Sequence, residues 1–429
     1  MNRAYFTAVL FLLINLSFAQ TPSQKKSPPL SEATPQSVGI SPERLKKLDA
    51  MLEESMKNDE NPGLVALVAR NGKIVYHTAK GSSDAISGKA MTKDAIFRIA
   101  SQTKAITSTA VMMLWEEGKF RLDDPISKFI PEFNNPRVLQ NFRYADTTFT
   151  TTPANKEITI RHLLTHTSGL GYGVIDGDER MRMIYKKAGI IDLYTTENVS
   201  IGDNIKKLAA LPLHHNPGEK YTYSEGLDVL GYLIEIVSGM PFDRFLRTRL
   251  FDPLGMSDTW FYLPESKAER LVKVQRKVEG KWENFPVTFY DPQYPVSGAK
   301  MFFSGGAGLS STAKDYATFL QMYLNGGELN GVRILSRKTI ETMMKNQIGD
   351  LWGGAKHYGL AFGVVTENGV AEGGIGSEGT FDWGGYFNTQ YFADPKEKII
   401  GILMKQTSQT SGDQTGWKFR QMVFTLLDD

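Results

Sequence analysis

Cysteine is absent from the 429 residues. Its absence excludes disulfides, thiolate zinc sites, iron–sulfur clusters and a cysteine nucleophile. An excess of one charge is also lacking, because 49 Lys and Arg residues stand against 47 Asp and Glu residues and leave a formal net charge of +2. This balance does not favour a nucleic-acid or anionic-membrane partner. We therefore expect small-molecule partners, and any covalent catalyst must act through oxygen or nitrogen.

Membrane-spanning runs are missing too: beyond the amino terminus no stretch approaches the ~18 apolar residues that a span needs. Residues 1–19 contain Arg3, an apolar stretch at about 8–16, and the small residues Ser17 and Ala19 before a possible cleavage point. This pattern predicts a Sec-type bacterial signal peptide, and hence a periplasmic or secreted protein, rather than a buried first helix. Because no cysteine follows the apolar stretch, a lipoprotein anchor is excluded.

What is present fits a folded protein with two lobes, since 41% of the residues are hydrophobic and 22% are charged. Residues 20–39 are rich in Pro, Ser and Lys and are predicted to form a flexible tether. A serine cap and a first-turn proline follow at 41–42, and Leu45, Leu48 and Leu52 recur with helical spacing. The first folded element is therefore expected to be a helix.

Strand signals follow this helix. Residues 64–70 and 73–79 are strand-like runs joined by Asn71-Gly72, whose tolerance of positive φ suits a two-residue hairpin turn. An antiparallel sheet is expected to begin here. The next run has apolar residues at helical spacing and ends at Gly118, which places Ser101 at or near a helix start.

Helical patterns separated by loops rich in Gly, Pro and Thr dominate from about 120 to 262. Strand signals return as two predicted hairpins, at 272–289 and at 381–393 with 399–405, and the closing residues 417–427 have helical spacing. Strands at both chain ends predict an α/β (α+β) fold, with an antiparallel sheet flanked by helices and an inserted helical lobe. We place the α/β lobe at 40–118 and 272–429 and the mainly helical lobe at 119–271.

Ser101 and Lys104 carry a hydroxyl and an amine three residues apart, which on a helix lie on the same face. Such a pair acts as nucleophile and base when the lysine stays partly neutral, while the helix amino end favours negative charge on the serine. Four Ser-x-x-Lys strings occur, beginning at Ser23, Ser101, Ser297 and Ser311. Ser101 is preferred because it opens an apolar helix, and Ser297, in a glycine-rich loop, is its main competitor.

Two further motifs carry chemistry. Tyr223, followed by Ser224 and Glu225, precedes an expected helix; such a tyrosine shuttles a proton if a cation lowers its pKa, and a packing role is the alternative. Residues 383–386 read Trp-Gly-Gly-Tyr within a late strand. Paired glycines let a substrate carbonyl approach the backbone, where the next N–H and that of Ser101 would form an oxyanion hole. A β-bulge is the alternative.

Together these motifs resemble the serine β-lactamase and penicillin-binding-protein superfamily. Other strings that resemble it are 158–170 (ITIRHLLTHTSGL), 223–224 with 228–231 (DVLG), 251–256 (FDPLGM) and 305–311 (GGAGLSS). The resemblance covers nearly everything from about residue 40 onward. It implies a cleft between a sheet-based lobe and a helical lobe, with Ser101 as the acylated nucleophile, Lys104 as its base and Tyr223 as a proton relay.

Two departures bear on the substrate. The family's second motif usually ends in Asn, whereas this chain has Glu225, which would add negative charge near the cleft and weakens the case for amide recognition. The third motif of β-lactamases is Lys-Thr-Gly, whereas this chain has Trp383-Gly384-Gly385, and loss of the lysine disfavours acidic β-lactams. The Trp-Gly-Gly string resembles family VIII carboxylesterases, which are similar to class C β-lactamases, and implies that the third-motif N–H belongs to Tyr386.

Other catalytic classes fit the sequence less well. It has no Gly-x-Ser-x-Gly elbow and no His-Glu-x-x-His zinc motif. His162 and His166 have a spacing that can bind metal on a helix, but no third ligand is evident, so no metal is expected. Residues 305–308 lack the Lys-Ser/Thr of a phosphate-binding loop. No cofactor is therefore predicted.

We predict an exported serine hydrolase that forms an acyl-enzyme on Ser101, a carboxylesterase with a small-molecule ester or amide substrate. A β-lactamase or D-amino-acid peptidase of the same superfamily is one alternative. A non-hydrolysing module that senses penicillin or peptidoglycan is another, kept open by Glu225. The sequence leaves the oligomeric state undefined.

Overall fold

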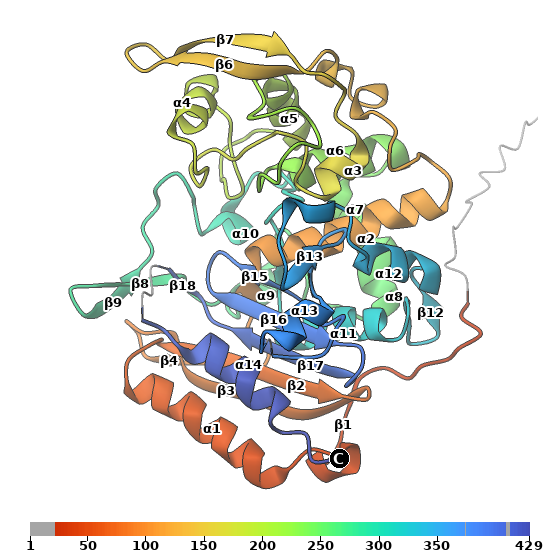
Figure 1. Cartoon of the computed structure of the whole chain (residues 1–429). Coiled ribbons are helices and arrows are strands. Elements are labelled where there is room, and N and C mark those ends of the chain that lie inside the picture. The colour runs from red at the N-terminus through yellow and green to blue at the C-terminus, as the bar shows by residue number, and fades with distance from the viewer. Residues whose placement is uncertain (1–21, 374, 409–411) are drawn as a thin grey trace, which may run out of the picture.

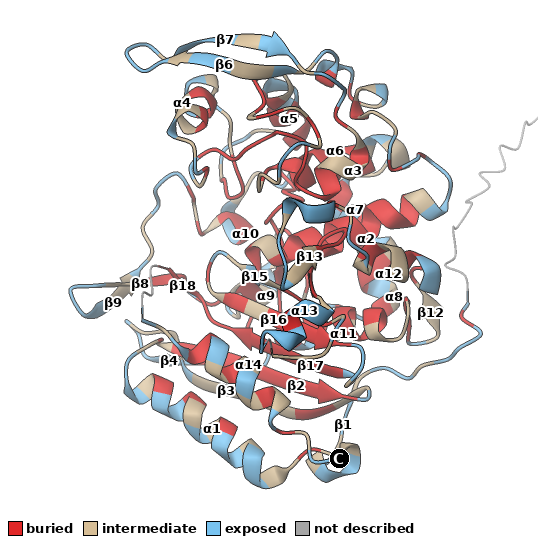
Figure 2. Cartoon of the chain, in the orientation of Figure 1, coloured by how far each residue is buried: buried red, intermediate tan, exposed pale blue. Residues whose placement is uncertain are grey.

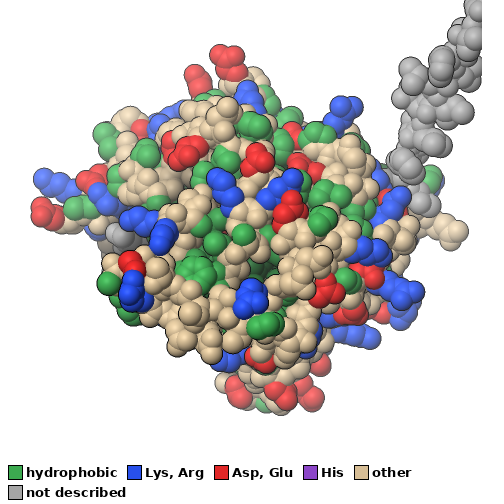
Figure 3. All heavy atoms as spheres, turned by 90° about the horizontal axis from the view of Figure 1, so that it is seen from above, with side chains coloured by type: hydrophobic (Ala, Val, Ile, Leu, Met, Phe, Trp, Pro, Cys, Tyr) green, Lys and Arg blue, Asp and Glu red, His purple; other side chains and the backbone are tan. Residues whose placement is uncertain are grey.

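The structure is a computed structural model that describes residues 22–373, 375–408 and 412–429 (Figure 1). The signal peptide predicted for residues 1–19 lies outside this part. Within it, no helix is both long and apolar enough to cross a membrane. Basic and acidic side chains are interspersed on the face drawn in Figure 3, so this face has no large patch of a single charge.

A nine-stranded sheet forms one half of the molecule, in the order β1-β3-β2-β17-β16-β15-β14-β13 with β4 paired to β3 (Figure 1). Only the β1–β3 pairing is parallel among these strands. Their bounds are β1 Ser31–Glu32, β2 Gly63–Arg70, β3 Lys73–Asp84, β4 Lys89–Ala90, β13 Lys356–Tyr358, β14 Gly363–Val365, β15 Phe381–Gly385, β16 Thr389–Asp394 and β17 Ile399–Met404. The predicted turn at Asn71-Gly72 joins β2 to β3, and both its residues have positive φ.

Helices cover both faces of this sheet. α1 (Pro42–Lys57) and α14 (Thr415–Phe424) pack on one face, and α2 (Thr103–Glu116) and α11 (Ala313–Leu324) lie on the other (Figure 1). Strand β2 is buried along its whole length, and its alternate side chains enter the two opposite cores. This explains its continuous apolar run, and the predicted antiparallel sheet flanked by helices is confirmed.

A group of helices lies on the far side of α2 from the sheet, with a two-stranded hairpin at its outer end (Figure 1). Its elements are β6 Arg137–Arg143, β7 Thr148–Pro153, α3 Ile160–Leu164, α4 Glu179–Ala188, α5 Ile201–Ala209, α6 Gly226–Ser238, α7 Phe242–Leu246, a π-helical turn at Arg247–Phe251 and α8 Asp252–Leu254. Buried residues concentrate in the sheet, in α2, which lies beside it, and in α6, which packs on α2 (Figure 2). The division at 118/119 and 271/272 stays a prediction.

Shorter elements connect these parts. They are the 3₁₀ turns Pro35–Val38, Ala100–Gln102, Ile126–Lys128, Pro131–Phe133 and Gly349–Leu351, the strands β5 Phe97–Arg98, β8 Gln275–Val278, β9 Lys281–Asn284, β10 Ser310–Ser311, β11 Glu328–Leu329, β12 Val332–Arg333 and β18 Thr407–Ser408, and the helices α9 Glu265–Ala268, α10 Tyr294–Ser297, α12 Arg337–Met344 and α13 Glu367–Ala371. The hairpin predicted at 272–289 forms β8 and β9, but it pairs with β18 in a separate small sheet. The strand predicted at 381–393 is two strands, because the chain reverses at 386–388, where Asn388 has a positive φ.

The tether predicted at 20–39 is a further correction over its described part. Strand β1 pairs with β3, the Ser27 N–H donates to the Glu328 carboxylate, and the Ser23 N–H donates to the Gly331 carbonyl. The proline-rich segment is therefore extended along the body, where its backbone donors find partners that its composition does not reveal.

Arg98 holds the strand that leads to Ser101. Its side chain is only 1% exposed, and burial lowers the pKa of its guanidinium to about 10. The guanidinium donates to the carbonyls of Pro292 and Val272 at 2.6 and 2.7 Å. The Arg98 N–H donates to Gln406 Oε1 at 2.7 Å. One side chain thus ties β5 to two distant segments.

We expect Arg98→Met to lower the free energy of unfolding by about 2–5 kcal/mol, because it leaves two buried carbonyls without donors at ~1–3 kcal/mol each. Urea denaturation measures this change. The exposed Arg121 provides a control, since Arg121→Met should change stability by less than about 0.5 kcal/mol. Equal effects of the two substitutions would contradict the role given to Arg98.

Candidate active site

Ser101 lies in the 3₁₀ turn that leads into α2 and is half-buried. The preceding Ala100 is fully buried with a φ of +46°, a left-handed conformation that non-glycine residues seldom adopt. Strand pairing of β5 with β10 and the hydrogen bond from the Ile99 N–H to the Leu309 carbonyl at 3.0 Å hold the turn. Backbone strain of this kind is typical of functional sites.

Lys104 is 1% exposed and points at Ser101. Its Nζ lies 3.3 Å from Ser101 Oγ, 2.9 Å from Tyr172 Oη and 2.8 Å from the Gly306 carbonyl oxygen. The structure thus brings the predicted nucleophile and base together. Ser297 is exposed like the lysine that follows it, and the buried Ser311 hydroxyl bonds to Thr259.

Tyr223 lies against the same amine, as predicted, but through its ring. Lys104 Nζ is 4.6 Å from the centroid of that ring. The hydroxyl that contacts Lys104 belongs instead to Tyr172, a fully buried residue that the sequence analysis missed. A signal was present, since Tyr172 follows the family-like string 158–170 by two residues.

Gly306 connects Lys104 to a second missed residue, Asp228. The Gly306 carbonyl accepts from Lys104, and its N–H donates to Asp228 Oδ1 at 3.3 Å. Burial raises the pKa of the Asp228 carboxyl, although a hydrogen bond from Ser304 and the charge of Lys104 oppose the shift. A Cβ at Gly306 would lie 2.5 Å from Asp228 Oδ2. Glycine is therefore required for this close approach.

The third motif packs beside the serine turn. A Cβ at Gly385 would lie 2.5 Å from the Ile99 carbonyl oxygen and 2.2 Å from Thr389 Oγ1, so only glycine lets β15 come this close. Tyr386 follows directly, with its side chain 41% exposed. The predicted residues 383–386 therefore adjoin Ser101.

Trp383 stands at the first position of the third motif, where the β-lactamases that the sequence resembles have a lysine. Its ring packs 6.0 Å from that of Tyr223 and 5.5 Å from that of Tyr358. The nearby Lys356 is engaged elsewhere, with its Nζ 2.7 Å from the Asp382 carboxylate. This wall of the site is accordingly aromatic and uncharged.

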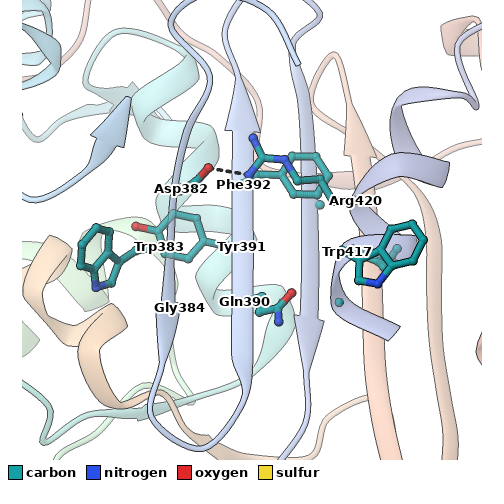
Figure 4. A pocket seen from close by; sticks show the side chains of 11 residues that line it. Asp382, Trp383, Gly384, Gln390, Tyr391, Phe392, Trp417 and Arg420 are labelled. Atoms are coloured by element: carbon teal, nitrogen blue, oxygen red, sulfur yellow. Dashed lines mark hydrogen bonds and ion pairs between the residues drawn. The ribbon is translucent and has the colours of Figure 1, made fainter. Parts of the chain in front are cut away.

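A pocket of about 300 Å³ lies on the opposite side of β15 and β16, against α14 (Figure 4). Asp382 and Trp383 both line it: the Asp382 carboxylate binds Arg420, whereas the Trp383 ring packs against Tyr223 beside Lys104. Trp417 closes the α14 side of the pocket. The sheet therefore separates this pocket from Lys104.

Glu225 corrects an expectation. It was predicted to add negative charge near the cleft, but its side chain is only 1% exposed. Burial raises the pKa of its carboxyl well above the usual range, and the charges of Asp192 and Asp228 raise it further. Its Oε1 has no hydrogen-bond partner within the described residues. The residue is thus a buried acid whose environment favours the protonated form, and it does not face the cleft.

This buried acid helps to hold the loop that carries Tyr172. Each of the four backbone N–H groups at 171–174 donates to a side-chain oxygen. The acceptors, in order, are Tyr185 Oη at 3.1 Å, Asp176 Oδ2 at 2.8 Å, the Glu225 carboxyl and Asp192 Oδ2 at 3.2 Å. The Tyr172 hydroxyl is therefore aimed at Lys104 by a loop with little freedom to move.

The two histidines noted in the sequence have structural contacts. His162 Nδ1 accepts from the Thr159 N–H at the start of α3. His166 Nδ1 accepts from the Ser224 N–H at 3.2 Å, and burial holds the pKa of His166 well below its usual value. Among the described residues, no group of three His, Cys, Asp or Glu side chains is arranged to hold a metal ion.

The fold and the contact between the half-buried Ser101 and the buried Lys104 define a serine hydrolase. The Beta-lactamase family model matches residues 48–422, and the chain belongs to this family, which confirms the predicted resemblance. Esterase EstB of Burkholderia gladioli is 30% identical over 394 residues, 84% of this chain and 90% of the esterase. Protein Rv1367c of Mycobacterium tuberculosis is 34% identical over 360 residues, 80% of this chain and 85% of that protein. The solved structure of EstCE1, a hydrolase with promiscuous acyltransferase activity, matches with a TM-score of 0.75 and 26% identity over 89% of this chain and 98% of EstCE1.

We expect Glu225→Gln to stabilise the protein increasingly as the pH rises from 5 to 7. Folded Glu225 keeps a proton that the unfolded chain loses above about pH 4.5, so the wild type loses up to about 1.4 kcal/mol per pH unit toward the folded pKa. Gln keeps an acceptor for the Gly173 N–H and does not ionise. Urea denaturation at each pH measures the gap, with exposed Glu265→Gln as the control. A gap independent of pH would contradict the neutral acid.

Proposed function

We propose that this serine hydrolase is an exported carboxylesterase that forms an acyl-enzyme on Ser101. The observation that carries the proposal is the contact of Lys104 Nζ with Ser101 Oγ at 3.3 Å, in a site where Tyr172 and Gly306 occupy the amine's other two directions. An uncharged lysine has two N–H donors and one lone pair. With the donors directed at Tyr172 Oη and the Gly306 carbonyl, the lone pair faces the serine.

Acylation begins when Lys104 takes the Ser101 hydroxyl proton and the serine oxygen attacks the ester carbonyl carbon. The negative charge that develops on the carbonyl oxygen is stabilised by the N–H groups of Ser101 and Tyr386, which the packing of Gly385 against Ile99 supports. Donors of this kind lower the barrier because they are already oriented before charge develops.

The proton then moves from Lys104 to the departing alkoxide as the ester C–O bond breaks. Tyr223 relays it from beside the amine, and Tyr172 holds the amine in line through its hydroxyl contact. Water repeats the sequence on the acyl-enzyme, with Lys104 again as the base, and releases the acid.

The aromatic wall at Trp383 supports a neutral ester over an acidic β-lactam or peptide. A lysine at that place would attract a substrate carboxylate, whereas the Trp383 ring packs against Tyr223 and Tyr358. The sensor alternative loses its motivation, since Glu225 is buried and does not face a ligand. Names of the relatives support the same choice, since EstB is an esterase and EstCE1 is a hydrolase.

Export is proposed from residues 1–19 alone. The basic start, the short apolar core and the small residues at 17 and 19 are typical of a signal peptide. Action outside the cytoplasm fits a chain without cysteine, because such a chain offers no thiol to oxidise. We propose a small-molecule ester as the substrate in the periplasm or the surrounding medium.

Ser101→Ala should abolish the acylation burst and turnover of p-nitrophenyl acetate while leaving the thermal midpoint of unfolding nearly unchanged. The serine hydroxyl is the nucleophile, and its loss removes the oxygen that forms the acyl bond. Stopped-flow absorbance measures the burst, and mass spectrometry after a fluorophosphonate probe locates the labelled residue. Ser297→Ala, the matched substitution in an exposed competing Ser-x-x-Lys string, should keep full activity. Retained turnover by Ser101→Ala would overturn the assignment.

The wild type should prefer an acyl ester to a chromogenic cephalosporin by at least about tenfold in kcat/KM, the range in which one missing contact discriminates substrates. The physical reason is the absence of a cation at Trp383. Trp383→Lys should narrow this ratio by improving the cephalosporin reaction. A wild type that hydrolyses the cephalosporin faster would favour the β-lactamase alternative.

A further inference from the structure

A second cavity, of about 530 Å³, lies between α4, the segment that follows it and Phe289 on the loop before α10. Its volume is within the range of small-molecule sites. Twelve residues line it: Gly173, Val174, Glu179, Arg182, Met183, Lys186, Ile190, Ile191, Asp192, Thr195, Glu197 and Phe289. None of the twelve belongs to a motif found in the sequence, although Glu225 of the second motif accepts the Gly173 N–H. The acylation steps do not use this group.

The cavity borders the loop at 171–174 that carries Tyr172. Gly173, which directly follows Tyr172, lines it. Asp192 also lines it, and its carboxylate accepts the Val174 N–H at 3.2 Å from the loop that aims Tyr172 at Lys104. The cavity wall and the position of the Tyr172 hydroxyl are therefore parts of one rigid unit.

A second connection runs along aromatic rings from the third motif. The ring of Tyr386, whose N–H is the proposed oxyanion donor, lies 5.6 Å from that of Tyr290. Tyr290 in turn lies 4.1 Å from Phe289, which lines the cavity, and its hydroxyl is 3.5 Å from Asp192. The cavity thus borders the loop that carries Tyr172, and two ring contacts link it to Tyr386.

The lining combines apolar and charged side chains. Val174, Met183, Ile190, Ile191 and Phe289 supply aliphatic and aromatic surface. Val174 and Phe289 are 40% and 48% exposed, a large solvent exposure for apolar side chains that face a common hollow. Charged side chains of both signs also border it, so a single ionic ligand is not favoured, and an uncharged chain is.

We propose that this cavity is the subsite that binds an extended apolar part of the ester, so that the enzyme acts on esters with a medium-length aliphatic or aryl group. This inference rests on the proposed carboxylesterase function. The same surface suits an apolar chain from the acyl or from the alcohol side, since hydrocarbon burial has no direction. A hydrocarbon group that leaves water for this surface is stabilised further by each CH₂ that it buries.

Filling the cavity tests this inference. Ile190→Trp places an indole in the hollow from the segment after α4, whereas Ile236→Trp adds the same bulk at a 40% exposed position on α6. We expect Ile190→Trp to lower the ratio of kcat/KM for p-nitrophenyl octanoate to that for p-nitrophenyl acetate by about tenfold, as loss of pocket contacts discriminates substrates. Ile236→Trp should leave this ratio within about twofold of the wild type.

Hydrolysis of octyl acetate, measured by pH-stat titration, shows whether the acyl group or the alcohol group of the ester occupies the cavity. A drop confined to octanoate places the acyl group in the cavity, a drop confined to octyl acetate places the alcohol there, and either result supports the proposal. Met183→Trp, which fills the hollow from α4, must give the same pattern. If both filling variants fold and neither long ester loses more than acetate does, the subsite is refuted.

Equilibrium binding separates this result from a failure of the proposed function. Calorimetric titration of Ser101→Ala with octyl acetate needs no turnover, and adding Ile190→Trp should weaken binding by about tenfold. Binding that depends on the cavity in a protein without esterase activity would refute the carboxylesterase and keep the apolar site. Esterase activity together with octyl acetate binding that Ile190→Trp does not weaken would keep the carboxylesterase and refute the apolar site.

Discussion

The buried amine of Lys104 is the group on which the rest of the site depends. Taking an amine out of water is unfavourable unless its polar atoms find partners, and here a serine hydroxyl, a tyrosine hydroxyl and a backbone carbonyl surround Nζ within 3.3 Å. The helix α2 supplies the spacing to Ser101, and Gly306 brings the carbonyl close because it has no side chain. Tyr172, from the helical part of the molecule, and Gly306, from outside that part, both contact this nitrogen.

Carboxyl groups that never touch the substrate give this arrangement its rigidity. Asp176, Asp192 and Glu225 accept consecutive backbone N–H groups of the Tyr172 loop, and Asp228 binds the N–H of Gly306. Burial raises the pKa of the Asp192 carboxyl to about 6 and also raises the pKa of the Glu225 and Asp228 carboxyls. Burying these carboxyl groups lowers the stability of the fold but fixes the positions of the Tyr172 loop and Gly306. Such a loss of stability is common where a protein holds catalytic groups in place.

Local signals were strong enough to predict much of this molecule. The Asn71-Gly72 hairpin, the helix that Ser101 opens and the glycines of the third motif each follow from backbone chemistry within a few residues. Tyr172 and Asp228 could not be found in this way, because their contacts with the Lys104 environment join segments tens to hundreds of residues apart. Glu225 was placed on the cleft because its position in a motif indicates neighbours along the chain, whereas burial depends on the whole fold.

The segment that was expected to be a loose tether has a consequence for how the protein behaves in a crowded solution. Strand β3 is the outer long strand of the sheet, and β1 pairs with it at Lys73–Ile74 while β4 pairs with it at Ser82–Asp84. Long uncovered edges recruit strands from other molecules and lead to aggregation or strand exchange. Both ends of β3 are therefore paired, and only its middle keeps an unpaired edge. By pairing with one end, the amino-terminal segment shortens the edge that a strand of another molecule could join.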